Sequence, residues 1–406
     1  RDPTTPRDPG SGPPPRDILR STVTTGGALQ DWVNNGLLAA IIGAVAFAAL
    51  FLPGLVWQYR RFGRLSFARL LGLAAVCLYA AALLTYTLLP LPERSVEWCQ
   101  LHARGMNLRP FAFIDDIREA APGRSLRGLL TSFAVLQVAF NVVLFVPFGV
   151  ILRRYFNRSV LVTTLLGAAT SLLIELTQLT GLWFIYPCAF RAADVDDLMT
   201  NTLGTILGAV LAPVLLWWMP RAHQLAQDRL TPRPVTMWRR WMGMLIDTVL
   251  VALVAGTTTV VLRAVILLLL RDGSEEWIPL ITPAAFAVAT IAVFVWPAWN
   301  HLAASVGQTV VWLTPKWRNA DGTLHDGSRL RRVVRSLVVP ASWLIPMFLA
   351  PFGTSSPFIW LLPLMVPLSL VMVPFTRTHR SLSGWLTGAQ MVDIRAEETD
   401  KALPVH

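Results

Sequence analysis

Long runs of apolar residues, separated by short polar segments, dominate the chain. A helix needs roughly 20 such residues to cross a bilayer, and most of the runs are that long. The last two are shorter and rich in proline. The runs lie at 37–57, 67–89, 133–152, 160–178, 198–218, 241–269, 278–299, 337–351 and 358–375. This pattern predicts an all-α, polytopic membrane protein with about nine transmembrane helices.

Basic residues are distributed unequally between alternate loops, and this bias predicts an orientation. With the N-terminus outside, the cytoplasmic segments hold 22 of the 35 Lys and Arg residues, and the outer segments hold 12. Acidic residues show the opposite bias, with 7 inside and 15 outside. Because cytoplasmic loops accumulate Lys and Arg, we expect the N-terminus outside and the C-terminus in the cytoplasm.

The composition agrees with a membrane protein and argues against a nucleic-acid partner. Only 15% of the residues are charged, against roughly 25% in soluble domains. The formal charge is +11, but the arginines flank apolar runs and do not alternate with aromatic residues in a soluble segment. We therefore expect them to face anionic lipid head groups.

A basic, proline-containing segment divides the apolar runs into a group of five and a group of four. The N-terminal segment has no sustained apolar period and is rich in Pro, Gly and Thr. We expect a disordered outer tail at 1–36, a five-span domain at 37–220, a cytoplasmic linker at 221–240, a four-span domain at 241–392 and a cytoplasmic tail at 393–406.

Polar residues gather near the outer ends of the third, fourth and fifth predicted spans. Glu175 lies within the fourth span, where a charge costs roughly 2.5–3.5 kcal/mol on insertion scales, so it is a functional candidate. Gln178 shares its helix face, Asn141 lies in the third span, and Asp197 and Asn201 open the fifth. With residues of the connecting loops, the predicted ligand-binding set is Asn107, Arg109, Asn141, Glu175, Gln178, Arg191, Asp194, Asp197 and Asn201.

This set suits two kinds of ligand. Arg109 and Arg191 offer planar, bidentate forks for an anionic head group or a phosphate. Glu175, Asp194 and Asp197 could instead hold a divalent cation, the cofactor that these residue types suggest. Structural alternatives stay open, because Asp197 could cap a helix and Glu175 could pair with either arginine. No nucleophile with a paired base is evident, so no catalytic residue is assigned.

Two of the three cysteines, Cys99 and Cys188, fall in predicted outer loops, where the environment permits disulfides. A bridge between them would hold the two loops over the polar residues, but sequence spacing alone does not establish their proximity. Cys77 lies within the second span and is expected to pack there. The cysteines lack the CxxC spacing of a thiolate zinc site.

Several of these segments resemble the VanZ-like family. The resemblance rests on Asn107-Leu-Arg-Pro-Phe111, 141–149, Glu175-x-x-Gln178 and 191–204, and it covers about 65–213. The family is named for a protein associated with low-level resistance to teicoplanin, a lipid-bearing glycopeptide. The resemblance therefore implies a multi-pass cell-envelope protein of the bacterial plasma membrane.

The second half resembles an RDD domain, a small membrane module named for its Arg and Asp residues. Arg240 followed by Asp247 is similar to the opening motif of that module, and the segments 305–309 and 382–392 are similar to its middle and its end. Gly384 stands where the module usually has Asp, which puts a charge-dependent activity in doubt. The whole chain is similar to actinobacterial fusions of the two modules.

These features favour a protein whose outer pocket recognises an anionic, lipid-linked head group such as a cell-wall precursor. One alternative is a lipid or ion transporter with Glu175 and Asp247 at the two ends of a path. Another is a non-catalytic scaffold in which the polar residues are structural. Asp247 itself is expected to pair with Arg240 or His301 and so fix the register of its helix.

Overall fold

The chain forms two compact units that divide its first two helices between them. The computed structural model describes residues 25–91, 94–102, 105–123, 125–189, 191–269, 278–300, 303–353 and 358–396. The first unit contains the described residues through Ala48 together with Gly72–Leu216, and the second contains Ala49–Leu71 together with the residues from Trp217 onward. Both α1 (Thr25–Phe62) and α2 (Phe67–Leu88) therefore contribute to each unit.

Seven of the described helices are long and apolar enough to cross a membrane. They are α1, α2, α6 (Phe133–Val150) with the π-helical segment η2 (Ile151–Tyr155), α7 (Val160–Leu179), α9 (Val195–Leu215), α11 (Met237–Leu269), and α12 (Ile278–Thr290) with the π-helical segment η5 (Ile291–Val295) and α13 (Trp296–Trp299). An eighth candidate is the pair α15 (Arg329–Leu337) and α16 (Ala341–Leu349), which is bent by 65°. The chain is thus a multi-pass helical membrane protein, as predicted.

The last two predicted runs form shorter helices than expected. The run at 337–351 contains α16, and the run at 358–375 contains the 3-10 helix η7 (Ile359–Leu364) and α17 (Met365–Phe375). Proline lies inside all three of these elements, where it removes a backbone donor and interrupts regular helix. The count of nine spans and the N-out orientation stay predictions.

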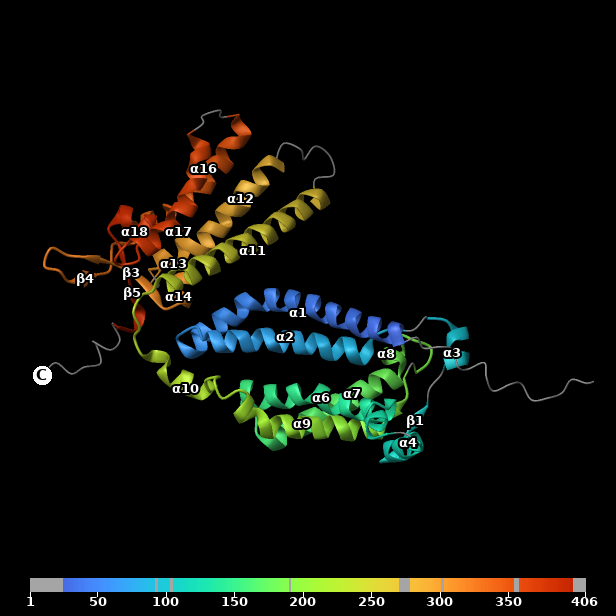
Figure 1. The fold of residues 1–406 in the computed structure, drawn as a ribbon. Coiled ribbons are helices and arrows are strands. Elements are labelled where there is room, and N and C mark those ends of the chain that lie inside the picture. Colours follow the sequence, from blue (N-terminus) through green and yellow to red (C-terminus); the bar gives the residue numbers. More distant parts are fainter. Residues whose placement is uncertain are drawn as a thin grey trace, which may run out of the picture. The chain divides into compact units, whose positions relative to one another are not determined.

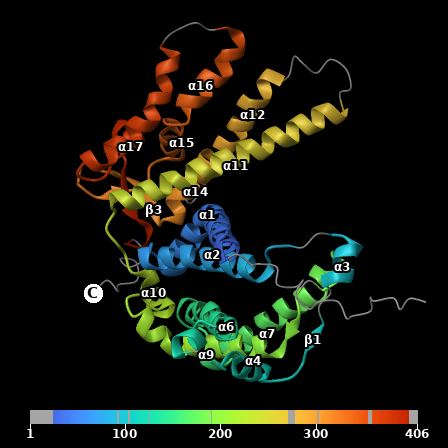
Figure 2. The same ribbon diagram turned by 45° about the vertical axis from the view of Figure 1, so that its right-hand side comes forward.

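The core of the first unit is formed by α6, α7 and α9, which lie side by side in both views (Figures 1 and 2). Small residues allow the backbones of α6 and α9 to come close. A Cβ atom added at Gly204 or Gly208 of α9 would collide with the carbonyl oxygen of Val142 or Val146 on α6. Leu207 of the same helix is 40% exposed, as suits a lipid-facing side chain. Close backbone approach at small residues is a usual way to pack helices within a membrane.

Short elements cover one end of this helical core. They are α3 (Val96–His102), β1 (Met106–Asn107), α4 (Ala112–Ala120), α5 (Leu126–Leu130), α8 (Gly181–Phe184) and β2 (Ala193–Asp194). The strands β1 and β2 pair in parallel, with Met106 opposite Ala193 and Asn107 opposite Asp194. This pairing brings the loop before α4 to the first turn of α9.

The second unit combines helices with a small antiparallel sheet. Its sheet has the strand order β4–β3–β5, formed by Leu324–His325, Leu313–Arg318 and Gln390–Asp393. The helix α11 packs against α12, α17 and the short α14 (Val306–Val310). The remaining elements are α10 (Ala222–Gln227), η3 (Asp228–Leu230), η6 (Ala350–Phe352) and α18 (Leu382–Thr387).

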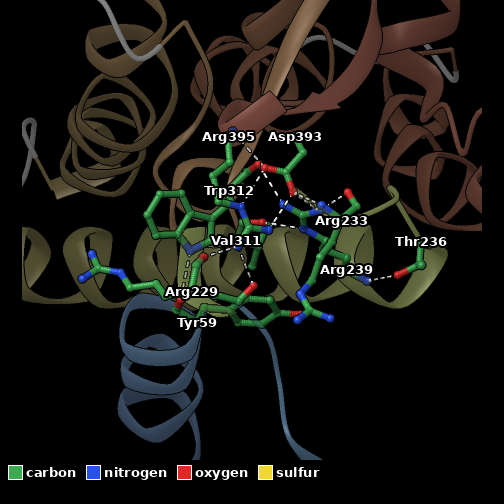
Figure 3. A network of polar contacts seen from close by, with 10 residues as sticks. Tyr59, Arg229, Arg233, Thr236, Arg239, Val311, Trp312, Asp393 and Arg395 are labelled. Atoms are coloured by element: carbon green, nitrogen blue, oxygen red, sulfur yellow. Dashed lines mark hydrogen bonds and ion pairs between the residues drawn. The ribbon is translucent and has the colours of Figure 1, made fainter. Parts of the chain in front are cut away.

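A buried network of ion pairs joins distant segments of the second unit (Figure 3). Asp393, at the end of β5, contacts Arg239 of α11 at 2.8 Å and Arg395 at 2.6 Å. Arg239 also donates hydrogen bonds to the carbonyl oxygens of Val311 and Trp312, at 2.7 and 2.8 Å. The guanidinium of Arg395 lies over the Trp312 ring, 5.1 Å from its centroid. The network therefore holds the start of α11 and the end of β5 against the turn after α14.

The boundaries of these elements differ from the predicted segments in three places. The helix α1 begins at Thr25, inside the segment expected to be a disordered tail, whose residues 1–24 lie outside the described part. The predicted linker contributes Arg239 to the buried network, and the predicted C-terminal tail contributes Asp393 and Arg395. Residues 397–406 lie outside the described part.

Candidate functional site

Asp194 joins three segments of the first unit. As the N-cap of α9, its Oδ1 accepts a hydrogen bond from the backbone N–H of Asp196 at 2.8 Å. Its Oδ2 accepts a hydrogen bond from Nδ2 of Asn107 at 3.0 Å. Its own backbone N–H donates to Oε2 of Glu175 on α7, also at 3.0 Å. An N-cap carboxylate satisfies an otherwise unpaired helical N–H, so capping is a real part of the role of Asp194.

The neighbouring carboxylate, Asp196, is buried and positions the start of α4. Its two oxygens accept hydrogen bonds from the backbone N–H groups of Phe111 and Phe113, at 2.6 and 2.9 Å. Phe111 has a left-handed backbone with φ of 64°, an uncommon conformation for a residue with a side chain. Asp196 is absent from the predicted ligand-binding set, and its contacts account for it as a support for the loop before α4.

The charged centre of the site consists of Glu175, Arg191 and Asp197. Oδ1 of Asp197 accepts a hydrogen bond from Nδ2 of Asn141 on α6 at 2.5 Å. Nη2 of Arg191 donates to the carbonyl oxygen of Leu89 at 3.1 Å. Burial lowers the pKa of Arg191, while the neighbouring carboxylates of Asp197 and Glu175 act in the opposite direction. The three charged side chains therefore interact at one end of α7 and α9, and we call them the charged centre.

Two further predicted residues, Gln178 and Asn201, connect helices of the first unit near this centre. Nε2 of Gln178 donates to the carbonyl oxygen of Thr87 on α2 at 2.7 Å. Nδ2 of Asn201 donates to Oγ of Ser171 on α7 at 2.9 Å. Both amides are 6% exposed, and Oδ1 of Asn201 is buried without a hydrogen-bond partner among the described residues. Neither partner has a distinguishing signal in the sequence. Isolated hydroxyls such as that of Ser171 are common in apolar spans, and the acceptor at Thr87 is a main-chain carbonyl.

Arg109 does not join the charged centre. Its side chain is 76% exposed and forms an ion pair with Asp115 of α4 at 3.0 Å. Its backbone N–H donates to Oδ1 of Asn107 at 3.2 Å, so Arg109 contacts the predicted ligand-binding set through its main chain. The two arginines that suggested an anion site thus have different surroundings, and of the two it is Arg191 that interacts electrostatically with Glu175 and Asp197.

A metal site at the predicted carboxylates is not supported. Within the described part of the chain, no group of three or more His, Cys, Asp or Glu residues is arranged to hold a metal ion. Protein donors occupy one oxygen of Glu175, one of Asp197 and both of Asp194. The carboxylates act as acceptors for backbone and amide N–H groups, which explains why they do not converge on one point.

A disulfide joins the two segments that lead into the parallel strands. Cys99 and Cys188 are bonded, with their Cα atoms 5.8 Å apart. Cys99 lies in α3, shortly before β1, and Cys188 lies shortly before β2. The bridge therefore restrains the same two loops that the hydrogen bond between Asn107 and Asp194 connects. Cys77 is a buried free thiol.

The helices and the polar residues described above fall within a segment that is similar to known proteins. Residues 76–217 match the VanZ/LLP1 family. We refer to the matched segment as the VanZ/LLP1 domain. Protein VanZ of Enterococcus faecium is 28% identical over 144 residues, which cover 35% of this chain and 74% of that protein. No solved structure matches the chain. The VanZ/LLP1 domain contains the charged centre and every residue of the predicted ligand-binding set.

The match ends before the second half, so the resemblance to an RDD domain stays a prediction. In this half Oδ2 of Asp247 accepts a hydrogen bond from Oγ of Ser305 at 2.6 Å, and Oδ1 accepts one from the N–H of Gly307 at 2.7 Å. Arg240 instead donates to oxygens of the turn at 379–381.

The expected pairing of Asp247 with Arg240 is therefore not formed, since no ion pair joins them among the described residues. The first turn of α14 occupies both carboxylate oxygens of Asp247. The other expected partner, His301, lies outside the described part.

Proposed function

We propose that the VanZ/LLP1 domain recognises the polar head group of a lipid-linked envelope molecule at its charged centre. The anionic part of the head group would contact Arg191, and its hydroxyl or amide groups would donate to Glu175 and Asp197. The proposal is carried by the arrangement of these three charged side chains. Glu175, near the end of α7, accepts a hydrogen bond from the N-cap residue of α9, and Arg191 interacts electrostatically with both Glu175 and Asp197.

Arg191 has the capacity to bind an anion. A guanidinium carries five N–H donors in a planar fork. The hydrogen bond to Leu89 uses one of them, and no other hydrogen bond of this side chain involves a described residue. The remaining donors suit the oxygens of a phosphate or carboxylate, which arginine binds in a bidentate manner. Partial burial strengthens such a contact, because less water competes for it.

The two carboxylates shape the preference for a larger head group. An ionised carboxylate can accept about four hydrogen bonds. Glu175 and Asp197 each accept one from the protein, so both retain acceptor capacity. Their negative charge would repel a bare dianion but would bind hydroxyl, amide or ammonium donors. The matching ligand therefore combines an anion with several donors, as a phosphate linked to a sugar or a peptide does.

The resemblance to proteins associated with teicoplanin resistance leads us to propose a phenotype for the same site. Occupancy of the charged centre by a cell-wall precursor would alter susceptibility to lipid-bearing glycopeptides. In this proposal the charged centre binds the precursor, and no covalent step is assigned to it. The transporter alternative stays a prediction. Glu175 and Asp247 belong to different units, and each carboxylate accepts hydrogen bonds from residues of its own unit.

Alanine variants in a teicoplanin-susceptible Gram-positive host test this proposal. We expect Arg191→Ala and Asp197→Ala to lose any protection that the wild-type chain gives, and to lose binding of a purified lipid-linked precursor in detergent. Arg109→Ala is the matched control, because it also removes an arginine from the domain but not from the charged centre. All variants should reach similar abundance in the membrane. The scaffold alternative instead predicts lower unfolding temperatures with unchanged precursor binding, and that result would overturn the proposal.

A further inference from the structure

The second unit contains a partly open cavity that the charged centre of the VanZ/LLP1 domain does not involve. It has a volume of about 110 Å³. A single water molecule needs only about 10–15 Å³ by a comparable measure, so the cavity has room for several water molecules. Residues of α11, η5, α15, α16 and α17 line it, together with residues within and just before α14 and α18.

Two hydrogen-bond donors at this cavity lack acceptors. Arg335 is 3% exposed and donates from Nη2 to Oε1 of Gln308 at 3.2 Å. Its Nε is buried and has no partner among the described residues, and the same holds for Nε1 of Trp343. Both side chains line the cavity. A buried donor without an acceptor loses its hydration without compensation, so both groups favour a ligand that supplies oxygen acceptors.

The charges around the cavity are unbalanced. Arg240 and Arg335 are 2% and 3% exposed, and Asp247 is 4% exposed. The three lie close enough to interact electrostatically, yet no ion pair joins Asp247 to either arginine within the described residues. Two buried cations against one carboxylate leave a formal charge of +1. Buried charge without a counter-charge is costly, so an anion in the cavity would stabilise this arrangement.

Part of the cavity wall is apolar, and hydroxyl side chains line much of the rest. Met244 of α11, Phe294 of η5, Val339 after α15 and Leu370 of α17 all line it. These elements include two helices with the length and composition of membrane spans, α11 and the helix that contains η5. Apolar walls beside unpaired donors match an amphiphile, because its tail and its head group require different surroundings.

We propose that this cavity binds a lipid with an anionic head group, which Arg335 and Trp343 hold by hydrogen bonds while the apolar wall contacts the tail. The site lies wholly within the second unit. It is independent of the function proposed for the VanZ/LLP1 domain, so a result that overturns one proposal leaves the other unaffected.

Binding measurements on the purified full-length chain in an uncharged detergent test the proposal with three probes. Lysophosphatidic acid carries both features, a monoacylglycerol with the same tail lacks the charge, and inorganic phosphate lacks the tail. We expect saturable binding of lysophosphatidic acid and a rise in the unfolding temperature with its concentration. Equal effects of the monoacylglycerol would overturn the role of the anion. Equal binding of inorganic phosphate would overturn the role of the tail.

Three variants connect the binding to the cavity. Arg335→Gln should weaken lysophosphatidic acid binding by about tenfold or more, as expected when a charged hydrogen bond is removed. Trp343→Phe keeps an aromatic ring but removes the indole N–H together with part of the ring system, and should weaken binding about threefold. Arg331→Gln is the control, because Arg331 is an exposed arginine of the same helix whose guanidinium lies over Trp317.

Wild-type affinity in both Arg335→Gln and Trp343→Phe would overturn the assignment. Equal weakening in Arg331→Gln would also overturn it, because that result would indicate a general effect of positive charge. If Arg335→Gln fails to fold, Trp343→Phe decides: unchanged affinity in that variant overturns the proposal and weakened affinity supports it.

Discussion

Asn107 and Asp194, 87 residues apart, meet in a hydrogen bond of 3.0 Å across the parallel pair of β1 and β2. The Asp194 carboxylate also caps α9, and the backbone N–H of Asp194 donates a hydrogen bond to Glu175. This one residue therefore fixes the loop before α4, the first turn of α9 and the end of α7 relative to one another. The geometry of the charged centre depends on it.

Replacing Asp194 by alanine should destabilise the first unit. The change removes an N-cap, which costs about 1 kcal/mol, and the acceptor of the Asn107 side chain, which costs a further ~1 kcal/mol. We expect a lower unfolding temperature for the purified protein in detergent. Asp115→Ala is the control, because Asp115 is partly exposed and pairs only with surface arginines. Equal unfolding temperatures for the two variants would contradict this role of Asp194.

The helices that carry the site residues, and the end of each helix at which they lie, could be predicted from the sequence. Glu175 and Gln178 interrupt an apolar run at helical spacing, and Asp197 and Asn201 do the same. Their partners could not be predicted, because the carbonyl oxygen that Gln178 contacts belongs to another helix and is present in every residue. Residue type alone also did not distinguish Arg109 from Arg191. Their neighbours decide that the guanidinium of Arg109 pairs with the partly exposed Asp115 and that of Arg191 with the carbonyl oxygen of Leu89.

Hydropathy predicted where the helices are but not which unit each one joins. The first apolar run reads as one span, yet α1 contributes to both units. A two-residue strand such as β1 has no periodicity at all, so its pairing with β2 leaves no signal in the sequence. The buried positions of Asp393 and Arg395 were also missed, because a charged C-terminal segment ordinarily indicates a solvated tail.

Gly208→Ala should destabilise the packing of α6 against α9. The added Cβ would collide with the carbonyl oxygen of Val146, and neither backbone can move without disturbing the helix pair. Gly256→Ala is a matched control within a helix, because nothing lies within 4 Å of its Cβ position. Alanine favours helix over glycine by up to ~1 kcal/mol, so this control should not lower stability. Unfolding temperatures in detergent check both expectations, and a Gly208→Ala protein as stable as wild type would show that the helices are less closely packed.

Asp393→Asn should strongly destabilise the second unit at neutral pH. The substitution leaves Arg239 and Arg395 buried without the carboxylate they share, and breaking a buried pair in this way costs about 3–5 kcal/mol. The unfolding temperature of the variant at pH 7 is the measurement. Asp321→Asn serves as the control, because Asp321 lies in an exposed turn and bonds only to its neighbour Thr323.

The same carboxylate should make the second unit sensitive to acid. Burial alone would raise the pKa of Asp393, but the hydrogen bonds and charges of Arg395 and Arg239 outweigh burial and hold the pKa below its usual value. An unfolded Asp titrates near pH ~3.9. The stabilisation is therefore fully present above about pH 4 and is lost as the pH falls through the lower folded value. Between pH 5 and acid unfolding, wild type should lose stability more steeply than Asp393→Asn, and parallel curves would contradict this.

Alkylation under denaturing conditions should label one cysteine of the three before reduction and all three afterwards. The disulfide between Cys99 and Cys188 protects two thiols, and Cys77 is the free one. Intact-mass measurement of the labelled protein gives the count directly. A Cys77→Ser variant should take up no label before reduction. Three labels without reduction would show that the bridge does not form in the cell.

Single cysteines at Arg109 and Arg318 should report opposite sides of the membrane. Both side chains are exposed, and five helices with the properties of spans, α6, α7, α9, α11 and α12, separate them. An odd number of crossings places the two positions on opposite sides, whatever the orientation of the chain. The bias of basic residues then decides which side is which. In a Cys77→Ser background, a membrane-impermeant maleimide added to intact cells should label Arg109→Cys, and should label Arg318→Cys only after permeabilisation. Labelling of both in intact cells would contradict the number of crossings, whereas the reverse pattern would contradict the orientation alone.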